Sequence, residues 1–202
     1  MKAKKFAGVF TIAAMISTFL LATADAQEPA FATKGIIEVS GSIAYSNYTN
    51  VSHGTASSNS TTFFSFGPKI SYFIVNGFEL GFDPGISILG FMPGVSFETS
   101  TGSSTTTLMQ LFVAPAYNFR TEGARVIPFI EVPVGYTSVS TTGPSESGLS
   151  WGVRAGVKTI ASGHLLISFF GEYFQMTFSP AGDSSREGFN FLSFGIGVGG
   201  FF

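Results

Sequence analysis

The chain has 202 residues, of which 45% are hydrophobic and only 11% are charged, whereas roughly 25% are charged in an ordinary soluble domain. It carries 10 basic and 12 acidic residues, a formal net charge of −2, and no cysteine. The absence of cysteine excludes disulfides, thiolate metal sites and a cysteine nucleophile. The slight excess of acidic residues argues against nucleic acid as a partner, because nucleic acid would call for a basic patch.

The first 26 residues are predicted to be a cleaved secretory signal peptide. A lysine cluster (2–5) precedes an apolar run (6–21), and Ala24 and Ala26 form an A-x-A cleavage site. An uncleaved N-terminal anchor is the alternative interpretation. Cleavage leaves 7 basic and 11 acidic residues, a net charge near −4. No later apolar stretch reaches the 18 residues that a helical membrane span requires.

Beyond the leader and a short N-terminal periplasmic segment (27–34), the remaining residues (35–202) alternate in hydrophobicity with a period of two, which is typical of strands. Each alternating run is about 13 residues long, more than twice a usual soluble strand and enough to span a membrane. The sequence therefore predicts eight long strands, at 35–48, 62–75, 78–91, 107–120, 126–138, 149–161, 165–178 and 189–202.

The connections between these strands alternate between short and long. The short ones include Asn76-Gly77, the strongest local signal for a tight hairpin. Short turns at one end and long polar loops at the other are typical of bacterial membrane barrels. We predict tight turns at 76–77, 121–125 and 162–164, and long loops rich in Ser, Thr and Gly at 50–61, 92–106, 139–148 and 179–188.

The two faces of the predicted strands differ in charge. One parity holds apolar and aromatic residues without a single charge, as a face toward lipid requires. The other parity holds every charged residue of the strands and is predicted to face the lumen of a barrel. This lumen charge network consists of Glu38, Lys69, Glu79, Asp83, Arg120, Glu131, Arg154, Lys158 and Glu172.

Aromatic residues of the apolar parity gather near the strand ends. Such belts mark the two membrane–water interfaces, where amphipathic rings are favoured. We predict an upper girdle of Tyr45, Tyr136, Trp151 and Tyr173 and a lower girdle of Tyr72, Tyr117, Phe119 and Phe202.

The last strand carries Phe194, Ile196 and Val198 at alternate positions and ends in Phe202, and the segment FFSFGPKISYFIVNGFELGF (63–82) forms one predicted hairpin. In these features the chain resembles small Gram-negative outer-membrane β-barrel proteins of the OmpA transmembrane-domain and OmpX type. The resemblance implies an eight-stranded antiparallel up-and-down transmembrane β-barrel in the outer membrane, with its long loops outside. It also implies that the barrel-assembly machinery reads the C-terminal signature. Outer-membrane lipids, lipopolysaccharide and a surface ligand bound through the loops are the other expected partners of a monomer.

The predicted lumen contains five acidic and four basic side chains, which must pair or be hydrated because an isolated buried charge is prohibitive. An eight-stranded barrel is just wide enough for side chains to fill, so a salt-bridged plug is favoured over an ion-selective pore. The first and last strands offer small residues toward the lumen and leave room for it: Ser40, Ser42, Ala44, Ser46, Ser193, Gly195, Gly197 and Gly199.

These features predict a non-enzymatic protein with a structural, adhesion or surface-interaction role. No catalytic, cofactor-binding or metal site is expected, since no cysteine or clustered histidine is available. Two alternatives remain. One is a conduit for small apolar solutes, as in OmpW-like barrels, which needs a lateral gap and an apolar lumen. The other is a lipid-modifying enzyme that uses Ser150, in a G-x-S-x-G match, with His53.

Overall fold

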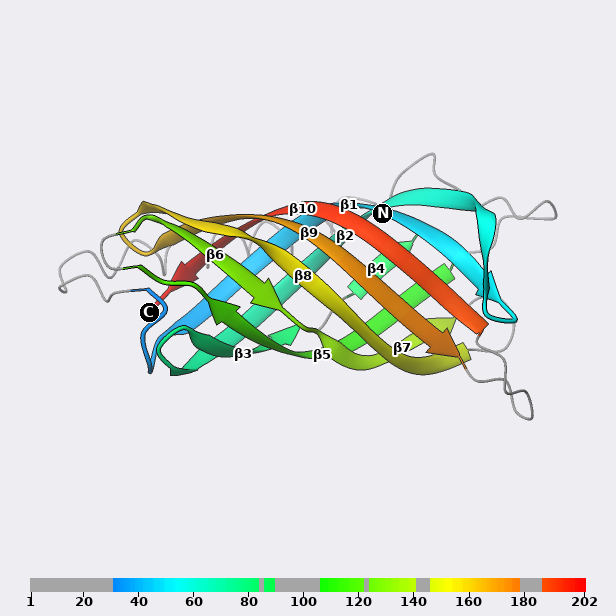
Figure 1. Ribbon diagram of the computed structural model, residues 1–202, viewed down its shortest axis with the longest axis horizontal. Coiled ribbons are helices and arrows are strands. Elements are labelled where there is room, and N and C mark those ends of the chain that lie inside the picture. The colour runs from blue at the N-terminus through cyan, green and yellow to red at the C-terminus, as the bar shows by residue number, and fades with distance from the viewer. Residues whose placement is uncertain (1–30, 84–85, 90–105, 122–123, 141–145, 179–186) are drawn as a thin grey trace, which may run out of the picture.

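The computed structural model describes residues 31–83, 86–89, 106–121, 124–140, 146–178 and 187–202. Within these ranges the chain forms strands and turns, and no helix there is long and apolar enough to cross a membrane. One closed antiparallel sheet winds obliquely about a long axis (Figure 1). Its strands are β1 (Ile37–Ser52), β2 (Thr55–Val75), β3 (Phe78–Asp83), β4 (Ile86–Leu89), β5 (Thr106–Asn118), β6 (Val126–Glu131), β7 (Val134–Ser140), β8 (Glu146–Ser162), β9 (Leu165–Phe178) and β10 (Glu187–Phe201).

These ten strands make an eight-stranded barrel because two of the barrel strands are interrupted. The register of β5 against β3 continues unchanged against β4, and the register of β8 against β6 continues unchanged against β7. Hence β3 with β4, and β6 with β7, each act as one strand of the wall. The prediction of an eight-stranded antiparallel barrel is confirmed.

The interruption between β6 and β7 has a local cause. Pro133 lacks the N–H group that a ladder needs on one side, so the regular pairing stops there. The Val132 N–H still donates to the Pro115 carbonyl, and the Gly152 N–H donates to the Pro133 carbonyl, both at 2.9 Å. The wall is therefore hydrogen-bonded on both sides of this interruption.

The first and last strands close the barrel. β1 pairs with β10 without a register shift from Glu38 opposite Phe201 to Val51 opposite Gly188. Both Ile37 and the chain end lie at the turn end of the barrel, next to the C label in Figure 1. Continuous pairing is what lipid demands, because each unpaired backbone group in hydrocarbon costs several kcal/mol.

One predicted loop is wrong. We expected an irregular loop at 50–61, whereas β1 and β2 continue outward and are joined by the two-residue turn His53-Gly54. Both turn residues have positive φ, 51° and 76°, as a type I′ hairpin turn requires. The Ser/Thr run after the turn forms a strand because a partner strand is already beside it. This β1–β2 hairpin projects at the end opposite the C-terminus (Figure 1). Most of the other three predicted long loops lies outside the described residues.

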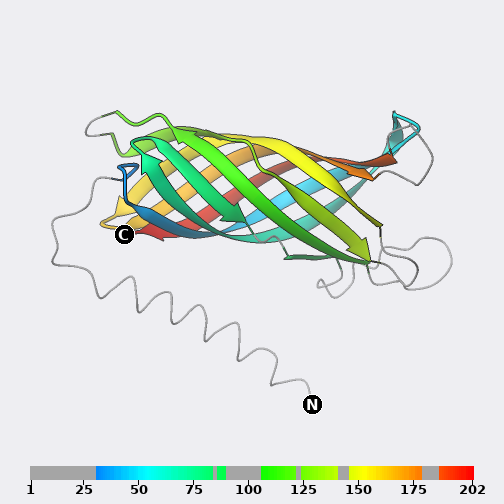
Figure 2. The ribbon, with the colours of Figure 1, turned by 90° about the horizontal axis from the view of Figure 1, so that it is seen from below.

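The two faces of the wall follow the predicted parity. Outward side chains are apolar and strongly exposed, for example Phe66 at 59% and Phe194 at 62%. Inward side chains, such as Phe73 and Glu79, are 0% exposed. Figure 2 shows the same closed wall from a second direction. The wall therefore presents an apolar outer surface around a filled interior.

Candidate functional site: the barrel lumen

An alternating chain of charges crosses the middle of the lumen. Lys158 Nζ lies 2.6 Å from Glu38 Oε2 and 2.9 Å from Glu79 Oε1. Lys69 Nζ lies 3.2 Å from Glu79 Oε1 and also bonds Glu131. The acidic and basic groups therefore follow one another in a single connected network.

Arg154 lies at one end of this charge network, where its guanidinium contacts three carboxylates. Its guanidinium lies 2.8 Å from Glu131 Oε1, 3.2 Å from Glu172 Oε1 and 3.7 Å from Asp83 Oδ2. Strand register explains two of these contacts, because Arg154 of β8 faces Glu131 of β6 on one side and Glu172 of β9 on the other. Such a fork suits a guanidinium, whose planar donors match carboxylates.

The turn end of the lumen is sealed by an apolar cluster that includes the N-terminal segment. The Phe31 side chain is 2% exposed, and its ring centroid lies 5.3 Å from that of Phe73 and 5.1 Å from that of Phe201. Lys158 Nζ lies 5.3 Å from the Phe31 ring centroid, a cation–π contact that joins the cluster to the charges above it. This turn-end cluster comprises Phe31, Ala32, Ile36, Phe73, Ile127, Leu166 and Phe201.

A second apolar cluster fills the lumen toward the loop end. It is mainly aromatic, with Phe112 and Phe174 packed edge to face at a centroid distance of 4.9 Å. Met176 at its centre is 0% exposed. The loop-end cluster comprises Phe112, Phe174, Met176, Phe178 and Phe191, with Phe189 packed against it. The lumen is thus layered: charged in the middle and apolar at each end.

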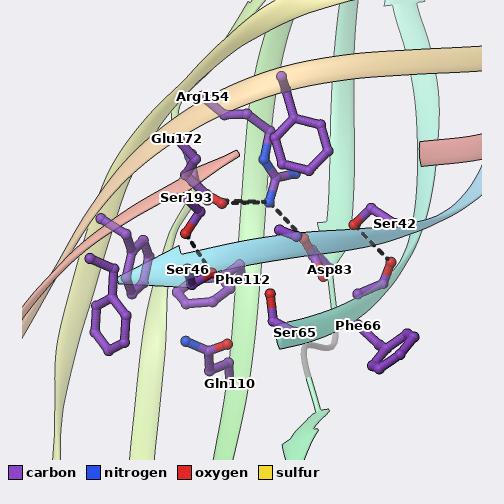
Figure 3. Close-up of a pocket in the computed structure, with 16 residues that line it drawn as sticks. Ser42, Ser46, Ser65, Phe66, Asp83, Gln110, Phe112, Arg154, Glu172 and Ser193 are labelled. Carbon is purple, nitrogen blue, oxygen red and sulfur yellow. Dashed lines mark hydrogen bonds and ion pairs between the residues drawn. The ribbon is translucent and has the colours of Figure 1, made fainter. Parts of the chain in front are cut away.

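A small cavity remains between the charged layer and the loop-end cluster (Figure 3). Its volume is about 70 Å³, enough for about two waters at their liquid density. Arg154, Glu172 and Asp83 line it together with hydroxyls of β1, β2 and β10 and several Phe rings. A second cavity of about 30 Å³ lies on the turn side and shares Arg154 and Asp83 as lining residues.

Small residues on β1 and β10 make room for this content, as predicted. At Gly195 an added Cβ would come within 2.4 Å of the Phe170 ring and 2.8 Å of the Ile43 carbonyl oxygen. Across the pairing of β1 with β10, hereafter the β1–β10 seam, the Ser46 hydroxyl bonds Ser193 Oγ at 2.8 Å. The seam therefore forms a thin wall against which larger side chains of other strands pack.

Eight of the nine predicted lumen charges lie in the network, and Arg120 does not. Arg120 is exposed beyond the end of β5, where its N–H donates to the Asn118 carbonyl oxygen at 2.9 Å. The parity of the sequence continued past the point where the strand ends, so its assignment to the lumen is corrected. The sequence reasoning also missed both apolar clusters, although Phe174, Met176 and Phe178 of the loop-end cluster stand on the inward parity of β9.

The predicted girdle residues lie on the outer surface. Their exposed fractions range from 40% for Tyr173 to 54% for Tyr136. Phe202 lies just past β10 at intermediate exposure, with its ring stacked on His164 at a centroid distance of 6.3 Å. The other proposed assembly residues, Phe194, Ile196 and Val198, are exposed. Recognition of these residues by the assembly machinery stays a prediction.

The residues considered for an enzymatic role do not meet. Ser150 is 0% exposed in the lumen, where its hydroxyl donates to Thr137 Oγ1 at 2.8 Å. His53 instead lies at the hairpin turn, where its backbone N–H donates to Glu187 Oε1 at 2.9 Å and its Nδ1 lies 3.1 Å from Ser52 Oγ. Glu187 thereby ties the hairpin tip to the start of β10. Within the described part of the chain, no group of three His, Cys, Asp or Glu residues is placed to hold a metal ion.

The barrel is similar to solved structures of small surface proteins. Neisserial surface protein A matches with a TM-score of 0.58 at 16% identity, over 82% of this chain and 99% of that protein. OprG, an outer membrane protein of Pseudomonas aeruginosa, matches with a TM-score of 0.55 at 11% identity, over 84% of this chain and 97% of that protein. Ail, the attachment invasion locus protein of Yersinia pestis, matches with a TM-score of 0.52 at 16% identity, over 84% of this chain and 100% of that protein. No protein-family model and no curated protein matches the sequence. At these identities the likeness shows the fold alone.

Proposed function

We propose that this chain is an integral outer-membrane protein whose barrel is a closed, non-conducting anchor and whose loop end binds a ligand at the cell surface. The observation that carries the proposal is the layered lumen, in which the ion-paired network lies between two apolar clusters. A lumen filled in this way leaves the loop end as the surface on which a partner can act.

The outer surface supports a membrane location. Large apolar side chains are 36% to 63% exposed along the wall, an arrangement that water penalises and hydrocarbon does not. The similar proteins include one named for attachment and invasion, which agrees with a ligand-binding role. Because short turns face the periplasm and longer connections face outward in such barrels, we place the turns in the periplasm and the β1–β2 hairpin outside.

The charge of the loop end narrows the ligand class. Across the four long connections predicted from the sequence, Arg186 is the single basic residue, against four acidic ones: Glu98, Glu146, Asp183 and Glu187. Ail has been solved with a heparin analogue, sucrose octasulfate. A polyanion of that kind does not suit this loop end, so we propose a neutral or cationic ligand surface.

The test has a conductance part and a binding part. Wild-type protein in planar bilayers is expected to give no stepwise channel currents; regular conductance steps would contradict the closed anchor. Replacing residues 50–61 by a two-residue turn is expected to leave a barrel that folds but to weaken adhesion of expressing cells. Unchanged adhesion after all four outer connections are shortened would move the functional site to the barrel itself.

A conduit for apolar solutes is the second candidate, because the loop-end cluster gives the lumen an apolar upper half. Solutes would then have to leave sideways above the charged layer. The wall beside Pro133 is hydrogen-bonded and offers no exit there. Within the described residues, the ladder of β2 with β3 ends at Ile70 opposite Phe82, and β4 pairs with β5 alone, so a lateral exit would lie between β2 and β4. Uptake of a radiolabelled apolar solute by vesicles holding the wild-type protein, above the rate of empty vesicles, would favour the conduit. Release of fatty acid from lipopolysaccharide by the refolded protein would instead support an enzyme.

A further inference from the structure

The ion-paired network in the lumen carries an excess of negative charge. Five carboxylates share three cationic groups, Lys69, Lys158 and Arg154. With every group ionised, the network has a net charge of −2. The apolar clusters above and below it remove solvent that would otherwise screen this excess. Uncompensated charge in such surroundings is strongly unfavourable.

One unit of this excess is located at Asp83. Glu38, Glu79, Glu131 and Glu172 each accept at least one hydrogen bond from a lysine or from Arg154. Asp83 accepts none from the residues that the structure describes, and Arg154 approaches it only to 3.7 Å. Its side chain is nevertheless only 10% exposed. A carboxylate this buried normally accepts hydrogen bonds, whereas Asp83 has one long ion pair with Arg154 and accepts no hydrogen bond within the described residues.

Asp83 faces the 70 Å³ cavity. The oxygens that line this cavity belong to Asp83, Glu172, Gln110 and four serines, and Arg154 and several Phe rings form the rest of its wall. Figure 3 shows Asp83 between Ser42 and Ser65, with Arg154 above it. Ser42 Oγ and Asp83 Oδ1 lie 3.4 and 3.6 Å from the point where a Cβ would stand on Gly67. Both oxygens therefore border the same small space, which the absence of a side chain at Gly67 keeps open.

We propose that this cavity binds a small hard cation, with Asp83 as its charged ligand and neighbouring hydroxyl, amide or water oxygens completing the shell. Carboxylate and neutral oxygens are the ligands that such ions prefer. A monovalent ion would halve the excess charge and a divalent ion would cancel it. The cavity volume of about 70 Å³ admits a small ion with its waters, so we expect a bulky organic cation to bind there less well.

The test compares small and bulky cations in the intact protein. The protein is refolded into detergent in NaCl, CaCl₂ or tetraethylammonium chloride at equal ionic strength, and Tm is measured for each. Wild type is expected to melt about 5 to 10 °C higher with a saturating small cation than with tetraethylammonium. The NaCl and CaCl₂ samples show whether the bound ion is monovalent or divalent.

Three variants make the test specific. Asp83→Asn is expected to melt at one temperature in all three salts, because it removes the charged ligand. It is also expected to melt above the wild type in tetraethylammonium, because it halves the excess charge from −2 to −1. Gly67→Ala fills the space at ordinary contact distances, so it is expected to fold and to lose the cation response. Glu187→Gln, which removes a carboxylate at the start of β10, outside the lumen network, is expected to respond as the wild type does.

Two results would overturn the proposal. One is a wild-type Tm that is the same with small and bulky cations, which would mean that protons or waters balance the charge. The other is a cation response that persists in Asp83→Asn, which would place the effect at the protein surface. If Asp83 only positions Arg154, Asp83→Asn will melt below the wild type in every salt.

Discussion

Arg154 contacts three of the five buried carboxylates, those of Glu131, Glu172 and Asp83. For Glu172 and Asp83 it is the cationic partner, whereas Glu131 also bonds Lys69. Arg154→Met is expected to lower the free energy of unfolding by about 3 to 5 kcal/mol, because it leaves buried carboxylates without a partner. Urea unfolding in lipid vesicles measures the change.

Arg120 provides the matched control for that measurement. It is an exposed arginine outside the network, so Arg120→Met is expected to change stability by less than about 0.5 kcal/mol. An equal decrease in the free energy of unfolding in both variants would show that the net charge of the protein, and not the buried ion pairing, determines stability.

Glycines at the β1–β10 seam differ in what surrounds them. Gly195→Ala would place a methyl group against the Phe170 ring and the Ile43 carbonyl, so we expect a loss of about 1 to 3 kcal/mol from overpacking. Gly41 lies on the lipid side of the same seam with no atom within 4 Å of an added Cβ. Gly41→Ala is expected to leave the free energy of unfolding unchanged in the same assay. A larger loss in Gly41→Ala than in Gly195→Ala would contradict the assignment of Gly195 to the lumen side and Gly41 to the lipid side.

Residue-level reasoning from the sequence worked where alternation alone decides which face a side chain takes. Glu131 and Arg154 were placed inside by parity, and the register puts them directly opposite each other. Arg120 failed because parity carries no information about where a strand ends. Asp83 was correctly placed inside. That no described residue donates a hydrogen bond to it depends on distances that no sequence pattern contains.

At the level of elements, the N-terminal segment contributes more than a link to the leader. Phe31 packs inside the turn end, and Gly77 and Gly35 hydrogen-bond this segment to the barrel through the Ala32 and Phe73 carbonyl oxygens, at 2.8 and 2.9 Å. Phe31→Ala is expected to cost about 3 to 5 kcal/mol, as for other buried Phe residues. Phe119→Ala, at an aromatic residue 52% exposed near the same end, should cost much less when both are unfolded in urea. A similar loss in both variants would mean that Phe31 is not part of the folded core.

Apart from the β1–β2 hairpin tip, the strand bounds were predictable within about three residues, and β9 matches its predicted range, because these strands follow a period of two. The β6–β7 interruption follows from Pro133, which the alternation of its neighbours concealed. The hairpin tip was read as a loop because Ser and Thr are common in both states, and pairing with β1 decides between them. Nothing near Phe31 in the sequence indicates that its partners include Phe73 and Phe201.

At the level of the whole molecule, the position of the apolar belt defines where the bilayer lies. Val126 and Val132 lie on the outer face of the same barrel strand, about 20 Å apart along it at 3.3 Å per residue. Val132→Arg is expected to cost about 2 to 4 kcal/mol near mid-membrane, and Val126→Arg, beside Arg125 at the turn end, about 0 to 1 kcal/mol. Equal costs in urea unfolding from lipid vesicles would contradict this placement of the bilayer.

The pairing of β1 with β10 also imposes an order on biogenesis. If the chain is exported as proposed, its N-terminal end with Phe31 and β1 crosses first, whereas Phe201 and β10 arrive last. Contacts between residues so far apart in sequence form late, since the chain must close its longest loop to make them. Until that moment β1 has an unpaired edge, and Phe31 lacks one of the rings against which it packs. A chain cut short during synthesis therefore has neither a closed wall nor a sealed turn end, so that only a finished polypeptide can become a barrel closed to the periplasm.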